Sequence, residues 1–324
     1  MVVEKVITSE RMTKLPQKTR MRRFLAYMNT NKLLLLMLLP GLISLVLFKL
    51  APLGGMIIAF QDFSAFRGVT GSPFVGLEHF QRIFEDPYIW TLVKNTVILA
   101  FYSLLFTFPI PILFALLLNE VRVRWIKGSV QSLSFLPYFI SSAVMVSILY
   151  TLLSPSTGLV NDILNRFGLD TIYFMAEPGW FRTNYVLLQV WQTFGYSAIV
   201  YIAAMAAIDP SVYESASLDG ASRFQQMLHI TLPSLKPTIA IMLIISVGNI
   251  FTVDLDRILL MYNQSVYETA DVIQTYVYRL AFASTGFPEY SYGTAVNLLK
   301  SVVAYILVVG TNKLSTKYSD TRLF

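Results

Sequence analysis

The sequence predicts an all-α integral membrane protein with six transmembrane helices. Hydrophobic residues make up 55% of the 324 residues and charged residues only 14%, whereas about 25% is usual in a soluble domain. The mean hydropathy is positive, at +0.58. Six apolar segments approach or exceed the roughly 20 residues that cross a bilayer. They lie at about 32–51, 92–118, 130–153, 185–208, 238–261 and 294–312.

The first segment is the most apolar of the six. Leu33 to Leu50 contains one charge, Lys49, near its far end. Its length exceeds the apolar run of a signal peptide, so we expect it to remain as a span. The second segment contains Pro109 and Pro111, which predict a kink. The transmembrane domain is thus predicted at 32–314, between a basic tail (1–31) and a short C-terminal tail (315–324).

The distribution of Lys and Arg predicts the orientation. Sixteen of the 25 lie in the N-terminal tail, the loops after the second and fourth spans, and the C-terminus. Because cytoplasmic segments carry this excess, both termini and the loop at 211–236 are predicted to be cytoplasmic. The net charge of +6 then lies beside anionic lipid, and we do not expect nucleic-acid binding.

The loop between the fourth and fifth spans predicts a helix–turn–helix. The first short helix is expected to begin near Ser211 to Glu214, and a turn is expected at Asp219-Gly220. A second short helix should follow from Ala221, and Pro233 should stop it because proline has no N–H to donate. Apolar side chains lie beside charged ones here, as suits a groove on another protein. The apolar ones are Ala216, Leu218, Met227 and Leu228, and the charged ones are Glu214, Asp219 and Arg223.

The spacing of this loop resembles the EAA loop of ABC-importer permeases. It reads Glu214-Ser215-Ala216, then Gly220, Ile230 and Leu232-Pro233, with Ser215 where the family usually has alanine. In the family this loop fits a cleft on a cytoplasmic ATPase. The resemblance therefore implies an ATPase-coupling site made of Glu214, Ser215, Ala216, Asp219, Gly220, Ile230, Leu232 and Pro233.

Further segments resemble one branch of this family. Residues 208–221 look like the carbohydrate-uptake branch of type I ABC importers, and 271–279 with 290–295 resemble its oligo- and polysaccharide sub-branch, some of whose members take up alginate or pectin-derived uronides. The resemblance implies a permease in the bacterial inner membrane that imports a saccharide by alternating access. It also implies a homologous second permease, a dimer of ATPases that bind ATP and Mg, and an extracytoplasmic solute-binding protein.

Polar side chains inside two spans predict a substrate pathway. Gln189, Gln192 and Tyr196 follow an i, i+3, i+7 spacing in the fourth span, and Asn249, Thr252 and Asp256 repeat it in the fifth. Such side chains at membrane depth face a cavity or a partner by default. The alternative is hydrogen bonding that joins the helices. Asp254 and Arg257 fall on another face and are expected to pair with a neighbouring helix or subunit, and Lys300 is expected to snorkel or pair.

The chain lacks the residues of an enzyme site. It contains no phosphate-binding Gly-x4-Gly-Lys-Ser/Thr loop and no cysteine, and its two histidines, His79 and His229, have no catalytic or metal-binding spacing. We therefore expect neither its own ATPase site nor a cofactor or metal. An ion-coupled secondary sugar transporter stays open, with Asp254 and Asp256 as candidate carboxylates. A membrane-embedded transferase would need an acid–base cluster, which the sequence does not offer.

Overall fold

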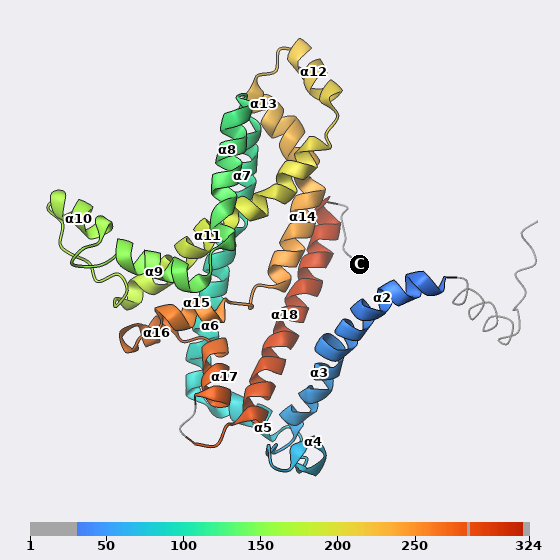
Figure 1. Ribbon diagram of the computed structural model, residues 1–324, viewed down its shortest axis with the longest axis vertical. Coiled ribbons are helices and arrows are strands. Elements are labelled where there is room, and N and C mark those ends of the chain that lie inside the picture. Colours follow the sequence, from blue (N-terminus) through green and yellow to red (C-terminus); the bar gives the residue numbers. More distant parts are fainter. Residues whose placement is uncertain (1–30, 284–285, 320–324) are drawn as a thin grey trace, which may run out of the picture. The chain divides into compact units, whose positions relative to one another are not determined.

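The computed structural model describes residues 31–283 and 286–319 (Figure 1). The predicted basic tail lies outside the described residues except for Asn31. At the other end, helix continues through Ser319 into the predicted C-terminal tail. The chain divides into two compact units, residues 1–57 and 58–324, which are described separately.

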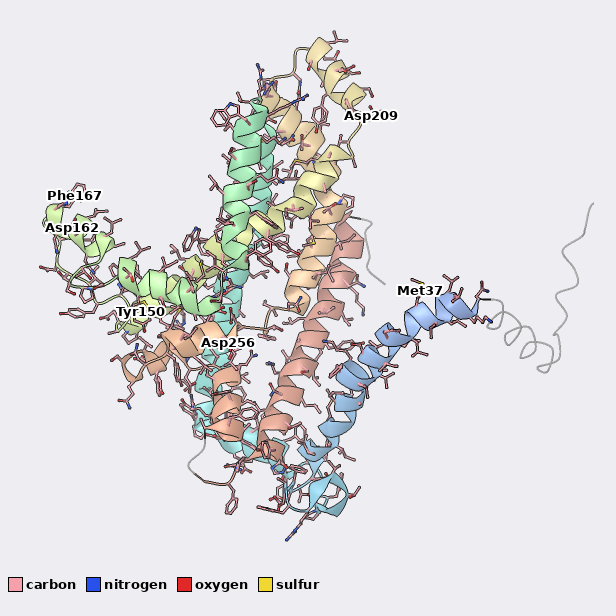
Figure 2. The ribbon with its side chains drawn as sticks, viewed as in Figure 1. Met37, Tyr150, Asp162, Phe167, Asp209 and Asp256 are labelled. Carbon is pink, nitrogen blue, oxygen red and sulfur yellow. The ribbon has the colours of Figure 1, made fainter. Side chains whose placement is uncertain are left out.

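The described part of the first unit is an apolar helix. It consists of α2 (Lys32–Leu45), the π-helical turn η1 (Val46–Leu50), α3 (Ala51–Gly54) and the start of the 3-10 helix η2 (Gly55–Phe60). Lys32–Phe60 has the length and hydropathy of a membrane span. Met37 is 80% exposed and points away from the helix (Figure 2). A helix that is apolar all round is typical of one that contacts lipid.

The regular secondary structure in the described residues of the second unit is helical, apart from one isolated bridge between Gln61 and Phe74. Four continuous stretches could span a membrane: Pro87–Asn119, Pro178–Ala206, Arg223–Gly248 and Tyr290–Lys313. The helices are α4 (Gly68–Gly71), α5 (Glu78–Glu85), α6 (Pro87–Thr107), α7 (Pro109–Asn119), α8 (Arg124–Phe135), α9 (Ser142–Leu152), α10 (Leu159–Arg166), α11 (Pro178–Ala206), α12 (Pro210–Leu218), α13 (Arg223–Gln226), α14 (Leu232–Gly248), α15 (Leu255–Met261), α16 (Tyr267–Ala270), α17 (Ile273–Phe282) and α18 (Tyr290–Ser319).

The second predicted span is interrupted where its prolines predicted a kink. Helix α6 ends at Thr107 and α7 begins at Pro109, which has no N–H to continue the first helix. Both helices still form one stretch long enough to cross the membrane. The prediction of a kink in this span is confirmed.

The third predicted span, 130–153, is not a continuous helix. Helix α8 is followed by the 3-10 helix η3 (Leu136–Phe139), and α9 then starts in a new direction, at 105° to α8. Pro137 lies in the 3-10 turn, and the Ser141 hydroxyl accepts the N–H of Val144 as the N-cap of α9. These two residues end one helix and start another within the apolar segment. The described residues thus contain five candidate spans, or six if this bent pair is one span.

The fifth predicted span, 238–261, is wrong at both ends. Helix begins already at Arg223 and α14 ends at Gly248, so residues 249–254 leave the helix before α15 starts. The Asp254 carboxylate caps α15 by accepting the N–H of Arg257 at 3.1 Å. Because the chain changes direction here, Asn249, Thr252 and Asp256 do not share a helical face as predicted.

Three clusters of buried apolar side chains hold this unit together. One joins α9, α11 and α15 around Leu99 and Tyr185, a second packs α6, α17 and α18 around Leu92 and Tyr292, and the third lies between α7, α11 and α14. Helices α8 and α11 cross at Gly195, where an added Cβ would lie 2.1 Å from the Ser134 carbonyl oxygen. Glycine is therefore required at this crossing.

Candidate functional site: the α12–α13 loop and the polar helix breaks

Helix α12 begins where the sequence predicts. Asp209 accepts the backbone N–H of Ser211 at 2.9 Å, and Pro210 occupies the first turn, where no N–H is needed. Hydrogen bonds from Ser211 hold the pKa of the exposed Asp209 carboxyl below its ordinary value. Asp209 and α12 lie at one end of the second unit, away from Asp256 on α15 (Figure 2).

The turn after α12 depends on Gly220. Its φ is +78°, in the left-handed region that favours glycine. The Gly220 N–H donates to the carbonyl of Ser217 at 3.2 Å, and the Ala221 N–H donates to that of Ala216 at 2.9 Å. These two bonds form a Schellman motif, which satisfies the free carbonyls at the end of α12. The predicted turn at Asp219-Gly220 is confirmed.

The second helix of the loop runs directly into α14. Ser222 and Gln225 form a capping box at the start of α13. The π-helical turn η4 (Met227–Thr231) then connects α13 to α14, and Pro233 lies in the first turn of α14. The prediction that Pro233 stops this helix is wrong. The hydrogen bonding changes from π-helical to α-helical just before Pro233, so the missing N–H of this proline breaks no required hydrogen bond.

Polar contacts fix the loop to the helices that enter the membrane. The Tyr213 and Thr231 hydroxyls lie 2.8 Å apart and join α12 to η4. The Gln226 amide donates to the Ser217 hydroxyl at 2.9 Å. Arg223 lies 3.5 Å from Glu120, directly after α7. A displacement of α12 would therefore be passed to α14 and to the end of α7.

The predicted coupling residues lie in α12, in the turn after it, in η4 and at the start of α14. Glu214, Ser215, Asp219 and Gly220 are exposed, whereas Ala216, Ile230, Leu232 and Pro233 are half-buried. Leu218 is 90% and Phe224 65% exposed. A hollow of about 350 Å³ lies between α12 and η4, with Ala216, Gly220 and Ile230 among its walls. Exposed apolar side chains around a hollow are typical of an interaction site.

Three of the six predicted pathway residues meet at a cavity of about 240 Å³. Gln189, Asn249 and Thr252 line it from α11 and the chain break after α14. Ser103 and Thr107 of α6 and Ser246 of α14 complete its polar wall. Within the part of the chain that the structure describes, Gln189 Oε1 and Ser103 Oγ are buried without a hydrogen-bond partner. These two buried polar groups are therefore suited to form hydrogen bonds with a polar ligand in the cavity.

The other three predicted pathway residues do not line this cavity. Tyr196 stacks on Tyr138, with ring centroids 3.8 Å apart and planes 4° apart. Asp256 is exposed in the first turn of α15. Gln192 is buried, and its amide donates to the carbonyl of Ile140 at 2.7 Å, in the break between α8 and α9. Gln192 therefore joins helices, as the alternative interpretation of these residues holds.

A buried ion pair connects the two helix breaks, and we call it the Arg257 clasp (Arg257, Asp254, Gln192). Arg257 is 4% exposed, lies 3.1 Å from Asp254 Oδ2, and donates to Gln192 Oε1. Asp254 also accepts the Ser142 hydroxyl at 3.0 Å, at the start of α9. The guanidinium lies 5.5 Å from the ring centroid of Tyr185, which lines the cavity. The clasp thus holds the wall of the cavity in place.

A second buried network lies toward the opposite end, and we call it the Asp271 network (Asp271, Arg279, Tyr88, Tyr262, Thr275). Both carboxylate oxygens of Asp271 accept from Arg279, at 2.7 and 2.6 Å. The hydroxyls of Tyr88, Tyr262 and Thr275 also donate to Asp271. Burial alone would raise the pKa of the Asp271 carboxyl, but hydrogen bonds from Arg279, Thr275 and Tyr88 outweigh it and lower the pKa.

Sequence reasoning missed part of each site. Ser103 and Thr107 are separated by four residues in the second span, so their i, i+4 spacing was a usable signal. Tyr88 had no such signal as a partner of Asp271, because it lies 183 residues away.

Comparison with known proteins decides the family. Residues 93–309 match the family described as binding-protein-dependent transport system inner membrane component. The chain belongs to this family.

Relatives of this inner membrane component cover nearly the whole chain. This chain is 41% identical over 308 residues to the polygalacturonan/rhamnogalacturonan transport system permease protein YteP of Bacillus subtilis, and the match covers 95% of both chains. It is 38% identical to the protein LplB of the same organism, over 93% of this chain and 94% of that one. A solved chain of a bacterial ABC transporter that imports the acidic polysaccharide alginate shares 40% identity, with a TM-score of 0.83, over 92% of this chain and 99% of that one.

Family membership and fold agree with the sequence analysis. The chain is a multi-pass inner membrane permease of the type I ABC importer fold, as predicted. The matches are to components of ABC transport systems, which removes the alternative of an ion-coupled secondary transporter.

Proposed function

We propose that this chain is one of two homologous permeases in an ATP-driven importer of uronic acid-rich oligo- or polysaccharides. The observation that carries this proposal is the near full-length similarity to two permeases whose cargo is acidic. One belongs to a polygalacturonan/rhamnogalacturonan system and one to an importer of alginate, described as an acidic polysaccharide. Alginate, polygalacturonan or a related uronide is therefore the cargo class we assign.

The α12–α13 loop is the surface that we assign to the ATPase. The Lys and Arg excess at the ends of the spans supports a cytoplasmic position for this loop and for both termini. Exposed Leu218 and Phe224 supply apolar contact beside Glu214 and Asp219. In this proposal the ATPase dimer binds ATP and Mg, and the permease itself has neither a catalytic residue nor a cofactor.

The path from loop to cavity is short and helical. Helix α14 has 17 residues, so it is about 25 Å long at 1.5 Å per residue. One end continues the loop through η4, and the other ends at Gly248, next to the cavity residue Asn249. ATP-driven movement of α12 would therefore reach the cavity wall through α14. Alternating access requires such a mechanical connection.

The saccharide is proposed to pass the Gln189–Asn249–Thr252 cavity after an extracytoplasmic binding protein delivers it. Amides and hydroxyls pair with sugar hydroxyls as both donors and acceptors. In this mechanism Gln189 Oε1 and Ser103 Oγ, which lack partners among the described residues, find them in the sugar.

The test is ATP hydrolysis by the reconstituted complete importer with its binding protein. Oligogalacturonate or oligomannuronate should stimulate hydrolysis at least fivefold more than a neutral maltooligosaccharide of equal length. Equal stimulation by both kinds of sugar would contradict the assigned cargo class. Glu214→Lys should abolish stimulation while the permease pair still forms, and unchanged stimulation in that variant would contradict the coupling surface.

A further inference from the structure

Lys300 is a cation near the middle of a membrane-spanning helix. It lies ten residues after Tyr290 in the span Tyr290–Lys313, so its Cα is about 15 Å from the near end. The lysine side chain, with five bonds, reaches only about 6 Å. Its ammonium therefore cannot snorkel to the headgroups from this depth, and an intramembrane charge of this kind marks a functional site by default.

Lys300 has no counter-charge within the residues that the structure describes. The carboxylates at the α14–α15 break are those of Asp254 and Asp256. Asp254 pairs with Arg257 and accepts from Ser142, and neither aspartate forms an ion pair with Lys300. Lys300 is half-buried rather than enclosed. Its ammonium is therefore available to a partner from outside this chain.

Helix α14 ends against α18 before it reaches Lys300. An added Cβ at Gly248, the last residue of α14, would lie 3.4 Å from Val308 of α18, so the two helices touch there. Lys300, Ala304 and Val308 follow an i, i+4, i+8 spacing and share a face. Lys300 precedes Val308 by eight residues, about two turns, and α18 continues past the end of α14 (Figure 1). Helix α14 itself therefore does not extend to the level of Lys300.

We propose that Lys300 binds a uronate carboxylate of the saccharide at the middle of the membrane. This inference rests on the proposed function, because it needs an acidic cargo. A flexible ammonium can follow a carboxylate without the fixed bidentate geometry that a guanidinium imposes. Weak, adaptable pairing suits a charge that must be bound and then released. Arg257, enclosed by Asp254 and Gln192, cannot serve in this way.

The experiment varies the charge at position 300 in the complete reconstituted importer, with oligogalacturonate as the probe. Lys300→Arg should keep stimulated ATP hydrolysis within twofold of wild type. Lys300→Met should reduce it at least fivefold and Lys300→Glu at least twentyfold, because the new carboxylate repels the cargo. Stimulation is expressed relative to the unstimulated rate of each variant. Lys94→Met, which removes an exposed cation from α6, is the matched control and should stay within twofold.

Two outcomes would overturn the assignment to the cargo. If Lys300→Met and Lys300→Glu prevent assembly with the second permease, the counter-charge is a carboxylate of that subunit. If all the variants respond to oligogalacturonate like wild type, Lys300 binds no carboxylate during transport. Wild-type importer that is not stimulated by oligogalacturonate would contradict the proposed function itself, so the two failures are distinguishable.

Discussion

The α12–α13 loop and the Asp271 network use polar side chains in opposite ways. In the loop, polar side chains cap the helix ends through local bonds and leave Glu214, Leu218 and Phe224 exposed. In the network, the polar side chains form hydrogen bonds with one another, and Asp271 is 1% exposed. The loop therefore has a surface free to bind a partner, whereas the network stabilises the fold and offers nothing to one.

The comparison also separates two kinds of sensitivity. A change in the loop should impair function before it impairs folding, because few buried contacts depend on it. A change in the network should do the reverse, because it leaves a buried charge without its partner.

The largest expected effect is on coupling, at Gly220. Gly220→Pro forces a negative φ where +78° is observed and removes the N–H that donates to Ser217. ATP hydrolysis stimulated by the loaded binding protein should fall at least tenfold, while the variant still inserts and assembles with the second permease. Gly220→Asn, which tolerates a left-handed backbone, should retain most of the activity. Equal losses in both variants would show that the turn geometry is not the cause.

The next effect concerns stability, in the Asp271 network. Asp271→Asn removes the charge that pairs with Arg279, at a cost of about 3 kcal/mol for a buried pair broken on one side. The free energy of unfolding of the purified chain, measured by titration from mild detergent into SDS, should show this loss. Asp162→Asn breaks the exposed pair with Arg166 on α10 and should change it by less than about 0.5 kcal/mol. Similar values for both variants would contradict the contrast between buried and exposed pairs.

A smaller effect tests whether the Arg257 clasp acts as a unit. Arg257→Met and Gln192→Met, made singly and together, form a double-mutant cycle. The double variant should be about 1–2 kcal/mol more stable than the sum of the two losses predicts, because either single change already breaks the shared hydrogen bond. The same SDS titration provides the values. Additivity within the experimental error would mean that the two side chains act separately.

The smallest expected effect is on the pH dependence of stability, at acid pH. The pKa of Asp271 is lowered in the folded protein, so its contribution to stability is complete above the unfolded carboxyl value of about 3.9 and is lost as the pH falls through the folded value. Between pH 7 and 5 this group should add no pH dependence. Below pH 4 wild type should lose stability more steeply than Asp271→Asn, as SDS titrations at several pH values would show. Parallel acid limbs would exclude Asp271 as their source.

Local signals predicted the loop well and the helix breaks poorly. Gly220 and the serine caps act on backbone groups within a few residues, so their effect can be predicted from the sequence. Apolar runs also predicted where the spans lie, and paired prolines predicted the kink after Thr107. Hydropathy alone cannot show that a span bends, because the break around Ile140 lies within an apolar run.

The function of single polar residues was the least predictable part. Gln189 and Gln192 lie one turn apart on α11, yet one lines the cavity and the other is held by Ile140 and Arg257. The difference arises from residues 52 and 65 positions away in the chain. Tertiary contacts of this range leave no periodic pattern, so the sequence could place both amides at the right depth without separating their roles.

The large sequence separation between the residues of the Asp271 network has a consequence for biosynthesis. Tyr88 is translated 183 residues before the aspartate it binds, which at 5–20 residues per second is roughly 10–40 s. Throughout that interval α6 must reside in the translocon or the bilayer with Tyr88 unpaired with its final partner, Asp271. Membrane insertion of α6 and closure of this network are therefore separate events in time, and a nascent chain truncated before residue 271 lacks both the network and the last span, Tyr290–Lys313.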